Sequence, residues 1–186
     1  MKLLLHCCCA PCSVSPVASL RAESIEPCLF WYNPNIHPFT EYDSRLNCLK
    51  EFAKNKNLEL KNSDAEYGLR YFLSEIYIDD KNRCSRCYEA RLLKTAARAA
   101  KDGYDAFSST LLVSPYQDHM AIKRAGEEIA SKLGVEFFYR DFRPLFREGQ
   151  AAARAAGLYL QKYCGCVFSE EERYAKKLPP WRGDAE

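Results

Sequence analysis

Eight of the ten cysteines gather in three short clusters along the chain. The first cluster has four thiols within six residues, which is more than packing alone requires. Cys-x-x-Cys and Cys-x-Cys spacings aim both sulfurs of a pair at one point, which suits a metal ion or an iron–sulfur cluster. We therefore predict a shared metal centre built from His6-Cys7-Cys8-Cys9-Ala10-Pro11-Cys12, Cys84-Ser85-Arg86-Cys87 and Cys164-Gly165-Cys166.

The number of candidate thiols favours an iron–sulfur cluster, with zinc binding and thiol redox chemistry as alternatives. A [4Fe–4S] cluster takes four thiolates, so eight thiols leave some for a second metal or a reactive thiol. A structural zinc site would also take four ligands, usually as two pairs. The isolated Cys28 and Cys48 are predicted to be small buried hydrophobes, one inside a strand and one inside an amphipathic helix.

The elements that must position these thiols alternate between strands and helices, a pattern typical of α/β proteins with a parallel sheet. We predict a single Rossmann-like α/β domain over residues 1–186. It should have a mostly parallel sheet of about five strands, helices on both faces and a helical insertion at 61–103. The expected strands are residues 1–7, 25–32, 58–60, 106–113 and 135–139, and the expected helices include 17–22, 84–102, 120–133 and 145–156.

Several helix ends carry specific expectations. The first helix should start at Ser13 or Ser15, with Pro16 in its first turn. Thr40 is a candidate cap for the second helix. Gly103 and Gly134 are well placed to terminate two later helices, because glycine readily adopts the left-handed conformation that ends a helix.

The helix expected at 84–102 is strongly basic. Residues 81–101 contain seven basic side chains and one acidic one, in a chain whose net charge is only +2. Basic residues at helical spacing form a stripe that leads to a candidate metal ligand. Such a positively charged stripe could bind a phosphate backbone, and a solvated helix face is the alternative interpretation. The stripe consists of Cys87, Arg91, Lys94, Arg98 and Lys101, and the expected inner face consists of Leu92, Leu93, Ala96, Ala97 and Ala100.

Motifs that are missing narrow the function. No Gly-x-Gly-x-x-Gly and no phosphate-binding Gly-Lys-Ser/Thr loop is present, so dinucleotide and P-loop enzymes are disfavoured. We find no secretory core and no run of roughly 20 apolar residues, so we expect a cytoplasmic protein without a membrane partner. His6 is expected to be a core residue beside the thiols. His119 is an active-site candidate, and Asp118 beside it is either part of that site or a helix N-cap.

Five sequence blocks, taken in order, resemble the QueH-type epoxyqueuosine reductases. No single block is specific, but the ordered set is, and it spans residues 3–174. The blocks are Leu4-Leu5-His6-Cys7-Cys8-Cys9-Ala10-Pro11-Cys12; Arg83-Cys84-Ser85-Arg86-Cys87-Tyr88 with Arg91; Ser109-Thr110-Leu111 with Ser114-Pro115-Tyr116-Gln117; Phe138-Tyr139-Arg140-Asp141-Phe142-Arg143; and Tyr163-Cys164-Gly165-Cys166-Val167-Phe168-Ser169.

The resemblance implies a cobalamin-independent enzyme that reduces epoxyqueuosine to queuosine in tRNA, the last step of queuosine biosynthesis. It also implies a [4Fe–4S] cluster with a second metal ion, iron, close by. Members of the family can have aspartate where this chain has Cys12, which leaves the ligand set of the second metal open. Cys7 has no assigned role. By motif position the main ligands would be Cys8, Cys9, Cys84, Cys87, Cys164 and Cys166, with Cys12 as a further metal ligand.

Removing an epoxide oxygen takes two electrons and protons and releases water, so the implied enzyme also needs an electron donor and a proton donor. Tyr116, Asp118 and His119 are the candidate proton donors. The modified base would have to leave its stack to reach the site. The residues predicted to hold the anticodon arm are Arg86, Arg91, Lys94, Arg98, Arg140 and Arg143.

Two other functions stay open at this point. An iron–sulfur tRNA thiolase of the ATP-pyrophosphatase kind would share the sheet and the cysteine pairs. It should show a Ser-Gly-Gly-x-Asp-Ser loop after the first strand, where this chain has His-Cys-Cys-Cys. A zinc-stabilised RNA-binding module would be colourless and would leave half of the thiols unused.

Overall fold

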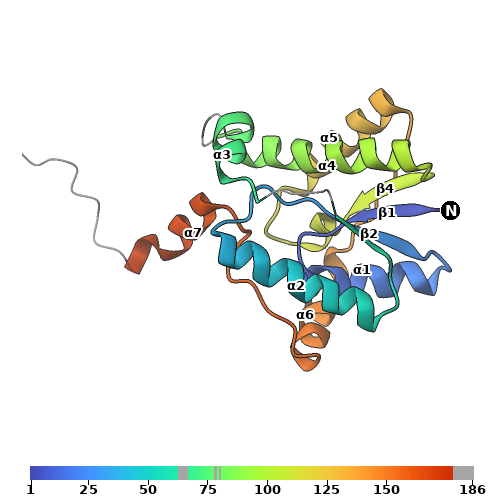
Figure 1. Cartoon of the computed structure of the whole chain (residues 1–186), viewed down its shortest axis with the longest axis horizontal. Helices are drawn as coiled ribbons and strands as arrows, with labels where there is room; N and C mark the ends of the chain where they lie inside the picture. Colours follow the sequence, from blue (N-terminus) through green and yellow to red (C-terminus); the bar gives the residue numbers. More distant parts are fainter. Residues whose placement is uncertain (63–66, 78, 80, 178–186) are drawn as a thin grey trace, which may run out of the picture.

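The computed structural model describes residues 1–62, 67–77, 79 and 81–177. Five parallel strands form one sheet in the order β3-β2-β1-β4-β5 (Figure 1). This confirms the predicted α/β fold and the number of strands. The strands are β1 (Leu3–His6), β2 (Pro27–Trp31), β3 (Leu60–Asn62), β4 (Ala106–Ser109) and β5 (Glu136–Phe137).

Helices cover both faces of the sheet, as predicted. α1 packs against α6 and α2 on one face, and α4 packs against α5 on the other (Figure 1). Because both faces are covered, the inner strands read as continuous apolar runs, and every residue of β1 and β2 is buried. The helices are α1 (Ala10–Ala22), α2 (Phe39–Asn55), α3 (Leu69–Tyr71), α4 (Arg83–Asp102), α5 (His119–Leu133), α6 (Phe146–Ala155) and α7 (Val167–Tyr174).

The order of the strands creates a switch point between β1 and β4. The chain runs from β1 to β2 and β3 on one side, and then crosses to β4 on the other side of β1. The last residues of these two strands, His6 and Ser109, lie directly opposite each other. Ligands of open α/β sheets bind at the carboxyl ends of the strands beside such a reversal. The first cysteine cluster follows His6 immediately.

α4 is the crossover helix between β3 and β4, so the predicted helical insertion at the sheet edge was wrong. It packs on β1 and β4 in the centre of the sheet, as a parallel connection requires. Its predicted inner face was partly wrong as well. Leu92 and Ala96 are buried, but Leu93 is exposed, and Arg91 is buried in its place. Ala97 and Ala100 are also exposed.

Several predicted element ends moved because the capping groups differ from those expected. α1 starts at Ala10, earlier than Ser13 or Ser15, because the Cys9 sulfur caps it, and Pro16 lies inside the helix. α2 begins after Pro38, so Thr40 is not its cap. The fourth strand ends at Ser109, whose hydroxyl accepts from the Leu111 N–H and starts a 3-10 turn.

Other expectations were confirmed or shifted slightly. Gly103 and Gly134 end α4 and α5 in the left-handed conformation. The third strand is shifted to residues 60–62 from the expected 58–60. Phe72 is buried, whereas Tyr67 and Tyr71 are exposed.

The contact between α5 and β5 leaves no room for a side chain at Gly126. A Cβ atom at that position would lie 2.3 Å from Cε1 of the Phe137 ring. We therefore expect Gly126→Ala to lower the free energy of unfolding by about 1–3 kcal/mol, the usual cost of overpacking a core. Thermal unfolding measures the effect. The control is Glu128→Ala on the exposed side of the same helix, which should change stability by less than about 0.5 kcal/mol. If the two variants have the same stability, the contact between Gly126 and Phe137 can accommodate an additional methyl group.

Candidate metal centre

Three thiols meet where β1 gives way to α1. The sulfur atoms of Cys8, Cys9 and Cys12 all lie within 4.8 Å of one another, and those of Cys8 and Cys9 are 3.8 Å apart. We call these residues the three-thiol group. Thr110, which directly follows β4, accepts a hydrogen bond from the Cys8 N–H at 3.2 Å and donates one to the Cys8 sulfur at 3.5 Å. The group therefore lies at the switch point of the sheet.

The surroundings of the three-thiol group favour the loss of one proton. The sulfur of Cys9 caps α1 by accepting from the Cys12 N–H at 3.4 Å, and a helix N-terminus stabilises a thiolate. Hydrogen bonds from Cys12 and Cys9 hold the pKa of Cys8 well below its usual value. Burial raises the pKa of Cys9, and the hydrogen bond to Cys8 raises that of Cys12. Cys8 is therefore the first member to lose its proton.

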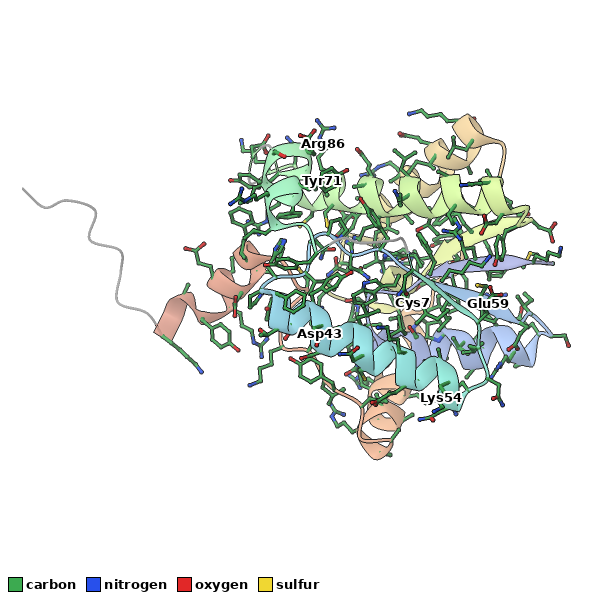
Figure 2. All side chains as sticks on the ribbon, in the orientation of Figure 1. Cys7, Asp43, Lys54, Glu59, Tyr71 and Arg86 are labelled. Carbon is green, nitrogen blue, oxygen red and sulfur yellow. The ribbon has the colours of Figure 1, made fainter. Side chains whose placement is uncertain are left out.

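Cys7 does not belong to this group. Its side chain is fully buried, and its thiol donates to the Leu5 carbonyl. Burial raises its pKa to about 12, so it stays protonated. Figure 2 shows it in the interior of the molecule. The buried Cys28 and Cys48 confirm their structural interpretation.

A four-thiol group forms where the start of α4 meets the Cys164-Gly165-Cys166 turn. The sulfurs of Cys164 and Cys166 are 3.8 Å apart. Cys87 interacts electrostatically with Cys164 and Cys84, and it packs in one apolar cluster with Cys166. Cys87 and Cys166 are buried, whereas Cys84 and Cys164 are exposed. The group is therefore anchored inside the protein and opens to the surface.

Arg45 fixes the turn that carries Cys164 and Cys166. Its guanidinium donates to the carbonyls of Tyr163 and Cys164, both at 3.0 Å, and pairs with Glu41 at 2.6 Å. Gly165 has φ +126°, and a Cβ atom there would lie 2.9 Å from Ile36. The close approach and the backbone conformation both demand glycine at this position.

The proton equilibrium within the turn resembles that of the first group. Its hydrogen bond with Cys166 lowers the pKa of Cys164 to about 5, and its hydrogen bond with Ser169 adds to the effect. The same bond between the two sulfurs raises the pKa of Cys166. Burial raises the pKa of Cys87 to about 11. One thiolate therefore forms readily in each group.

Arg91 lies between the two groups. It is only 4% exposed, and its Nε donates to the Cys87 carbonyl at 3.1 Å. Burial opposes its charge, but Cys87 and Cys8 outweigh burial and raise the pKa of the guanidinium. No carboxylate pairs with Arg91 among the residues that the structure describes. A buried cation without a carboxylate needs an anionic neighbour, and the thiol groups supply it.

Both donor sets fit metals that prefer sulfur. Tetrahedral ligands at a metal–sulfur distance of about 2.3 Å lie about 3.8 Å from one another. The three-thiol group is close to this spacing and leaves a fourth position open, as catalytic sites do. The four-thiol group offers the ligand number of a [4Fe–4S] cluster. The structure thus sorts the six predicted ligands and Cys12 into two groups on either side of one guanidinium.

The predicted tRNA-binding residues are scattered. Arg91 is buried, so its predicted place on a surface stripe was wrong; Arg86 and Lys94 are exposed, with Arg86 at the outer end of α4 (Figure 2). The remaining three arginines each bind a carboxylate. Arg98 pairs with Asp102 at 2.7 Å, Arg140 with Glu23, and Arg143 with Asp141 at 2.6 Å. Their contact with RNA stays a prediction.

The three predicted proton donors lie together around the start of α5. Asp118 caps this helix through the Ala121 N–H at 2.9 Å, which was its alternative role. His119 is buried, and one of its ring nitrogens bonds the Tyr139 hydroxyl at 2.9 Å. Tyr116 is 83% exposed. The link to the thiols is Tyr88, the neighbour of Cys87, which accepts from the Asp118 N–H at 3.3 Å.

Sequence reasoning missed three residues that contact the thiols or fix their loop. They are Gln161, Arg45 and the hydroxyl of Thr110. Gln161 donates to the sulfurs of Cys9 and Cys12 at 3.0 and 3.4 Å. Each lies far along the chain from the cysteine it contacts, and only Thr110 falls inside one of the family blocks, where it had no assigned role.

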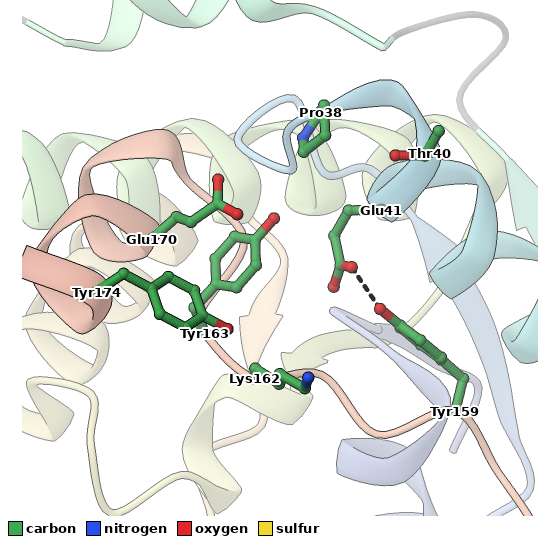
Figure 3. Close-up of a pocket in the computed structure, with 8 residues that line it drawn as sticks. All are labelled: Pro38, Thr40, Glu41, Tyr159, Lys162, Tyr163, Glu170 and Tyr174. Carbon is green, nitrogen blue, oxygen red and sulfur yellow. Dashed lines mark hydrogen bonds between the residues drawn. The ribbon is translucent and has the colours of Figure 1, made fainter. Parts of the chain in front are cut away.

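A cavity of about 260 Å³ lies beside the segment that leads into the Cys164 turn. Tyr159, Tyr163 and Tyr174 line it together with Lys162 and Glu41, and the Tyr159 hydroxyl bonds Glu41 (Figure 3). Tyr163 directly precedes Cys164 and is the lining residue nearest to the thiols along the chain. Aromatic walls with a nearby ammonium group are features of surfaces that stack nucleobases.

His37 supports the same turn and makes stability depend on pH. Its backbone N–H donates to the Gly165 carbonyl at 2.8 Å, and burial lowers its side-chain pKa from 6.5 to about 4. Between these values the unfolded chain takes up a proton that the folded protein does not. Stability is therefore fully present above pH 6.5 and is lost as pH falls towards 4, by up to roughly 3 kcal/mol.

We expect His37→Gln to lack this component. Urea unfolding at several pH values measures it: the wild-type free energy should fall more steeply than that of the variant between pH 6.5 and 4. Between pH 8 and 7 the two proteins should run in parallel, which is the internal control. Parallel curves over the whole range would mean that His37 titrates normally.

Among the described residues, no helix is long and apolar enough to cross a membrane. The family model for "Epoxyqueuosine reductase QueH" matches residues 3–172. A curated protein of that name from Dehalococcoides mccartyi is 38% identical over 96% of this chain and 98% of its own length. Another from Thermotoga maritima is 36% identical, with 94% of this chain and 93% of the relative covered.

Solved structures with the same fold are more distant in sequence. The U34-tRNA thiolase NcsA from Methanococcus maripaludis, determined with its [4Fe–4S] cluster, superposes with a TM-score of 0.63 at 14% identity. The match covers 95% of this chain and 63% of that one. A predicted tRNA methyltransferase subunit from Methanocaldococcus jannaschii gives 0.52 at 12% identity, over 82% and 74% of the two chains. At this identity the likeness shows the fold alone.

Proposed function

The chain belongs to the epoxyqueuosine reductase QueH family, and from this membership we propose that it reduces epoxyqueuosine in tRNA to queuosine. The reaction converts an epoxide into an alkene. One epoxide, two electrons and two protons give one alkene and one water, so an external reductant must supply the electrons. A tRNA substrate would place the enzyme in the cytoplasm.

The observation that carries this proposal is the pair of thiol groups on either side of Arg91. We propose that the four-thiol group holds a [4Fe–4S] cluster and that the three-thiol group holds a second metal ion, iron. When bound, these cofactors would supply single electrons and a Lewis acid for the epoxide oxygen. The buried Arg91 offsets the negative charge of the thiolates, and Arg45 keeps Cys164 and Cys166 in place.

The chain's own residues would bind the substrate and supply protons. The tyrosine-lined cavity beside Cys164 is the place where we propose that a base stacks. Among the proton-donor candidates, Tyr116 is open to a substrate, and His119 is buried and bonded to Tyr139. Asp118 would hold the start of α5, and with it His119, in place, since its carboxylate already caps that helix.

The exposed cations of α4 give a test of RNA binding. We expect Arg86→Glu combined with Lys94→Glu to weaken tRNA binding and to reduce the slope of log affinity against log salt by roughly one unit for each phosphate that is no longer neutralised. Filter binding at several salt concentrations measures both quantities. Lys132→Glu, in the last turn of α5, is the control and should bind tRNA as the wild type does. An unchanged slope in the double variant would make this face a solvated surface only.

The direct test of the function uses protein purified without oxygen. Iron, zinc and acid-labile sulfide are counted per chain, and the protein is then incubated with tRNA carrying epoxyqueuosine and a chemical reductant. We expect about four sulfides with four to five irons, and conversion of the nucleoside to queuosine by mass spectrometry. Stoichiometric zinc without sulfide or colour, and no conversion, would favour a zinc-stabilised RNA-binding module. Sulfur transfer to tRNA with ATP would favour a thiolase.

A further inference from the structure

Gln161 is the one described side chain outside the cysteines that donates to two sulfurs of the three-thiol group. Its Nε2 lies 3.0 Å from the sulfur of Cys9 and 3.4 Å from that of Cys12. It comes from the segment between α6 and the Cys164 turn, 149 residues after Cys12. A metal-bound thiolate accepts hydrogen bonds and repels an amide oxygen, so this orientation of the amide suits sulfurs that bind a metal ion.

The other end of the same carboxamide is buried and has no partner among the residues that the structure describes. Oε1 of Gln161 is shielded from solvent and accepts no hydrogen bond from that part of the chain. A buried acceptor without a partner is costly, and in native proteins such an atom usually bonds a ligand or an ordered water. Because Oε1 and Nε2 share one carbon, Oε1 lies within a few ångströms of the sulfurs that Nε2 contacts. A ligand bound to the three-thiol group could therefore supply the hydrogen bond that Oε1 lacks.

We propose that Gln161 is a positioning residue with two tasks. Its amide N–H groups hold the thiolates of Cys9 and Cys12 in the orientation that binds a metal ion, and its oxygen accepts from a hydroxyl-bearing ligand at the remaining position. The inference deepens the proposed function, since an alcohol or water is what an opening epoxide yields. It concerns this chain's residues alone, and metal binding without tRNA tests it.

The first test is titration of the metal-free protein with Co²⁺ without oxygen, followed by the sulfur-to-cobalt absorption. The Cys12→Ser variant identifies the spectral component that belongs to the three-thiol group. Loss of a hydrogen-bond partner of metal ligands typically costs 10–100-fold in metal affinity. We expect Gln161→Leu and Gln161→Glu to lose affinity in this range and to shift the absorption. Glu should be the worse of the two, because it adds a negative charge and removes the donors.

The second test addresses Oε1 through two small thiols that differ by one hydroxyl, 2-mercaptoethanol and ethanethiol, added to the Co²⁺-loaded protein. One hydrogen bond corresponds to a preference of about 2- to 13-fold. We expect the wild type to prefer the hydroxyl-bearing thiol by such a factor, and Gln161→Leu to bind both equally. Gln150→Leu, on α6, is the matched control for both tests.

The outcomes separate this inference from the proposed function. Unchanged Co²⁺ affinity and spectrum in Gln161→Leu would overturn the first task, and an equal preference in wild type and variant would overturn the second. If both effects appear but tRNA is not reduced, the role of Gln161 stands and the reductase proposal fails. If tRNA is reduced while Gln161→Leu behaves as the wild type in both titrations, the reductase stands and the inference fails.

Discussion

Replacing Arg91 by methionine is expected to lower the iron and sulfide content of anaerobically purified protein at least about tenfold. The guanidinium is buried, faces Cys87, Cys8 and Cys164, and has no carboxylate among its described neighbours. Removing one side of a buried charge interaction costs about 3–5 kcal/mol, because the other side is left uncompensated. Metal–thiolate centres are anionic, so their binding should suffer by that amount. Iron and sulfide analysis with the visible spectrum measures the effect.

The same substitution should act in the opposite direction on the metal-free protein. There only single thiolates offset the charge of the guanidinium, which is less than a metal–thiolate centre offers, and a methionine of similar length removes the desolvation cost of the guanidinium altogether. We therefore expect metal-free Arg91→Met to be at least as stable to urea as the metal-free wild type, which separates loss of metal from loss of fold. Arg91→Lys should recover part of the iron. Arg98→Met, two turns further along α4, is the control. Normal metal content in Arg91→Met would refute the idea that Arg91 offsets the negative charge of both thiol groups.

Single substitutions in the two thiol groups are expected to remove different metals. Cys166→Ala should lose labile sulfide, because it removes one of four cluster ligands. Cys12→Ala should keep its sulfide and lose one iron, because the three-thiol group would be left with two ligands. Both variants should reduce epoxyqueuosine on the order of a thousandfold more slowly, since electron supply and Lewis-acid catalysis are each worth several kcal/mol.

Cys48→Ala is the matched control, since this cysteine is buried inside α2 and is a member of neither group. It should keep iron, sulfide and activity, with only a modest loss of stability. If Cys12→Ala and Cys166→Ala instead lose iron and sulfide in the same proportion, the seven thiols hold one centre. The prediction from the sequence, a single metal centre shared by the three cysteine clusters, would then be correct.

The fold was predictable from the sequence because its signals are local. Apolar runs such as Leu3-Leu4-Leu5 are buried on both faces, and they mark parallel strands whatever their neighbours are. Gly103 ends α4 through its own backbone conformation. The helix start at Cys9 was missed because a thiol is an unusual cap. The role of α4 as the crossover helix was missed because the order of strands depends on pairing between distant segments and cannot be deduced from any single segment.

By itself, the sequence determined which residues carry the chemistry, since the three cysteine clusters, their spacing and the family blocks are all visible in the linear order of residues. Only the tertiary structure decided how they are grouped. Cys8, Cys9 and Cys12 meet at the switch point, whereas Cys84 and Cys87 meet a turn that comes about 80 residues later in the chain. Helical periodicity placed Arg91 on one face of α4 but left open whether that face turns to solvent. The thiols brought there by β1 and the Cys164 turn decide it, because a buried guanidinium is stable only beside anions that the fold supplies.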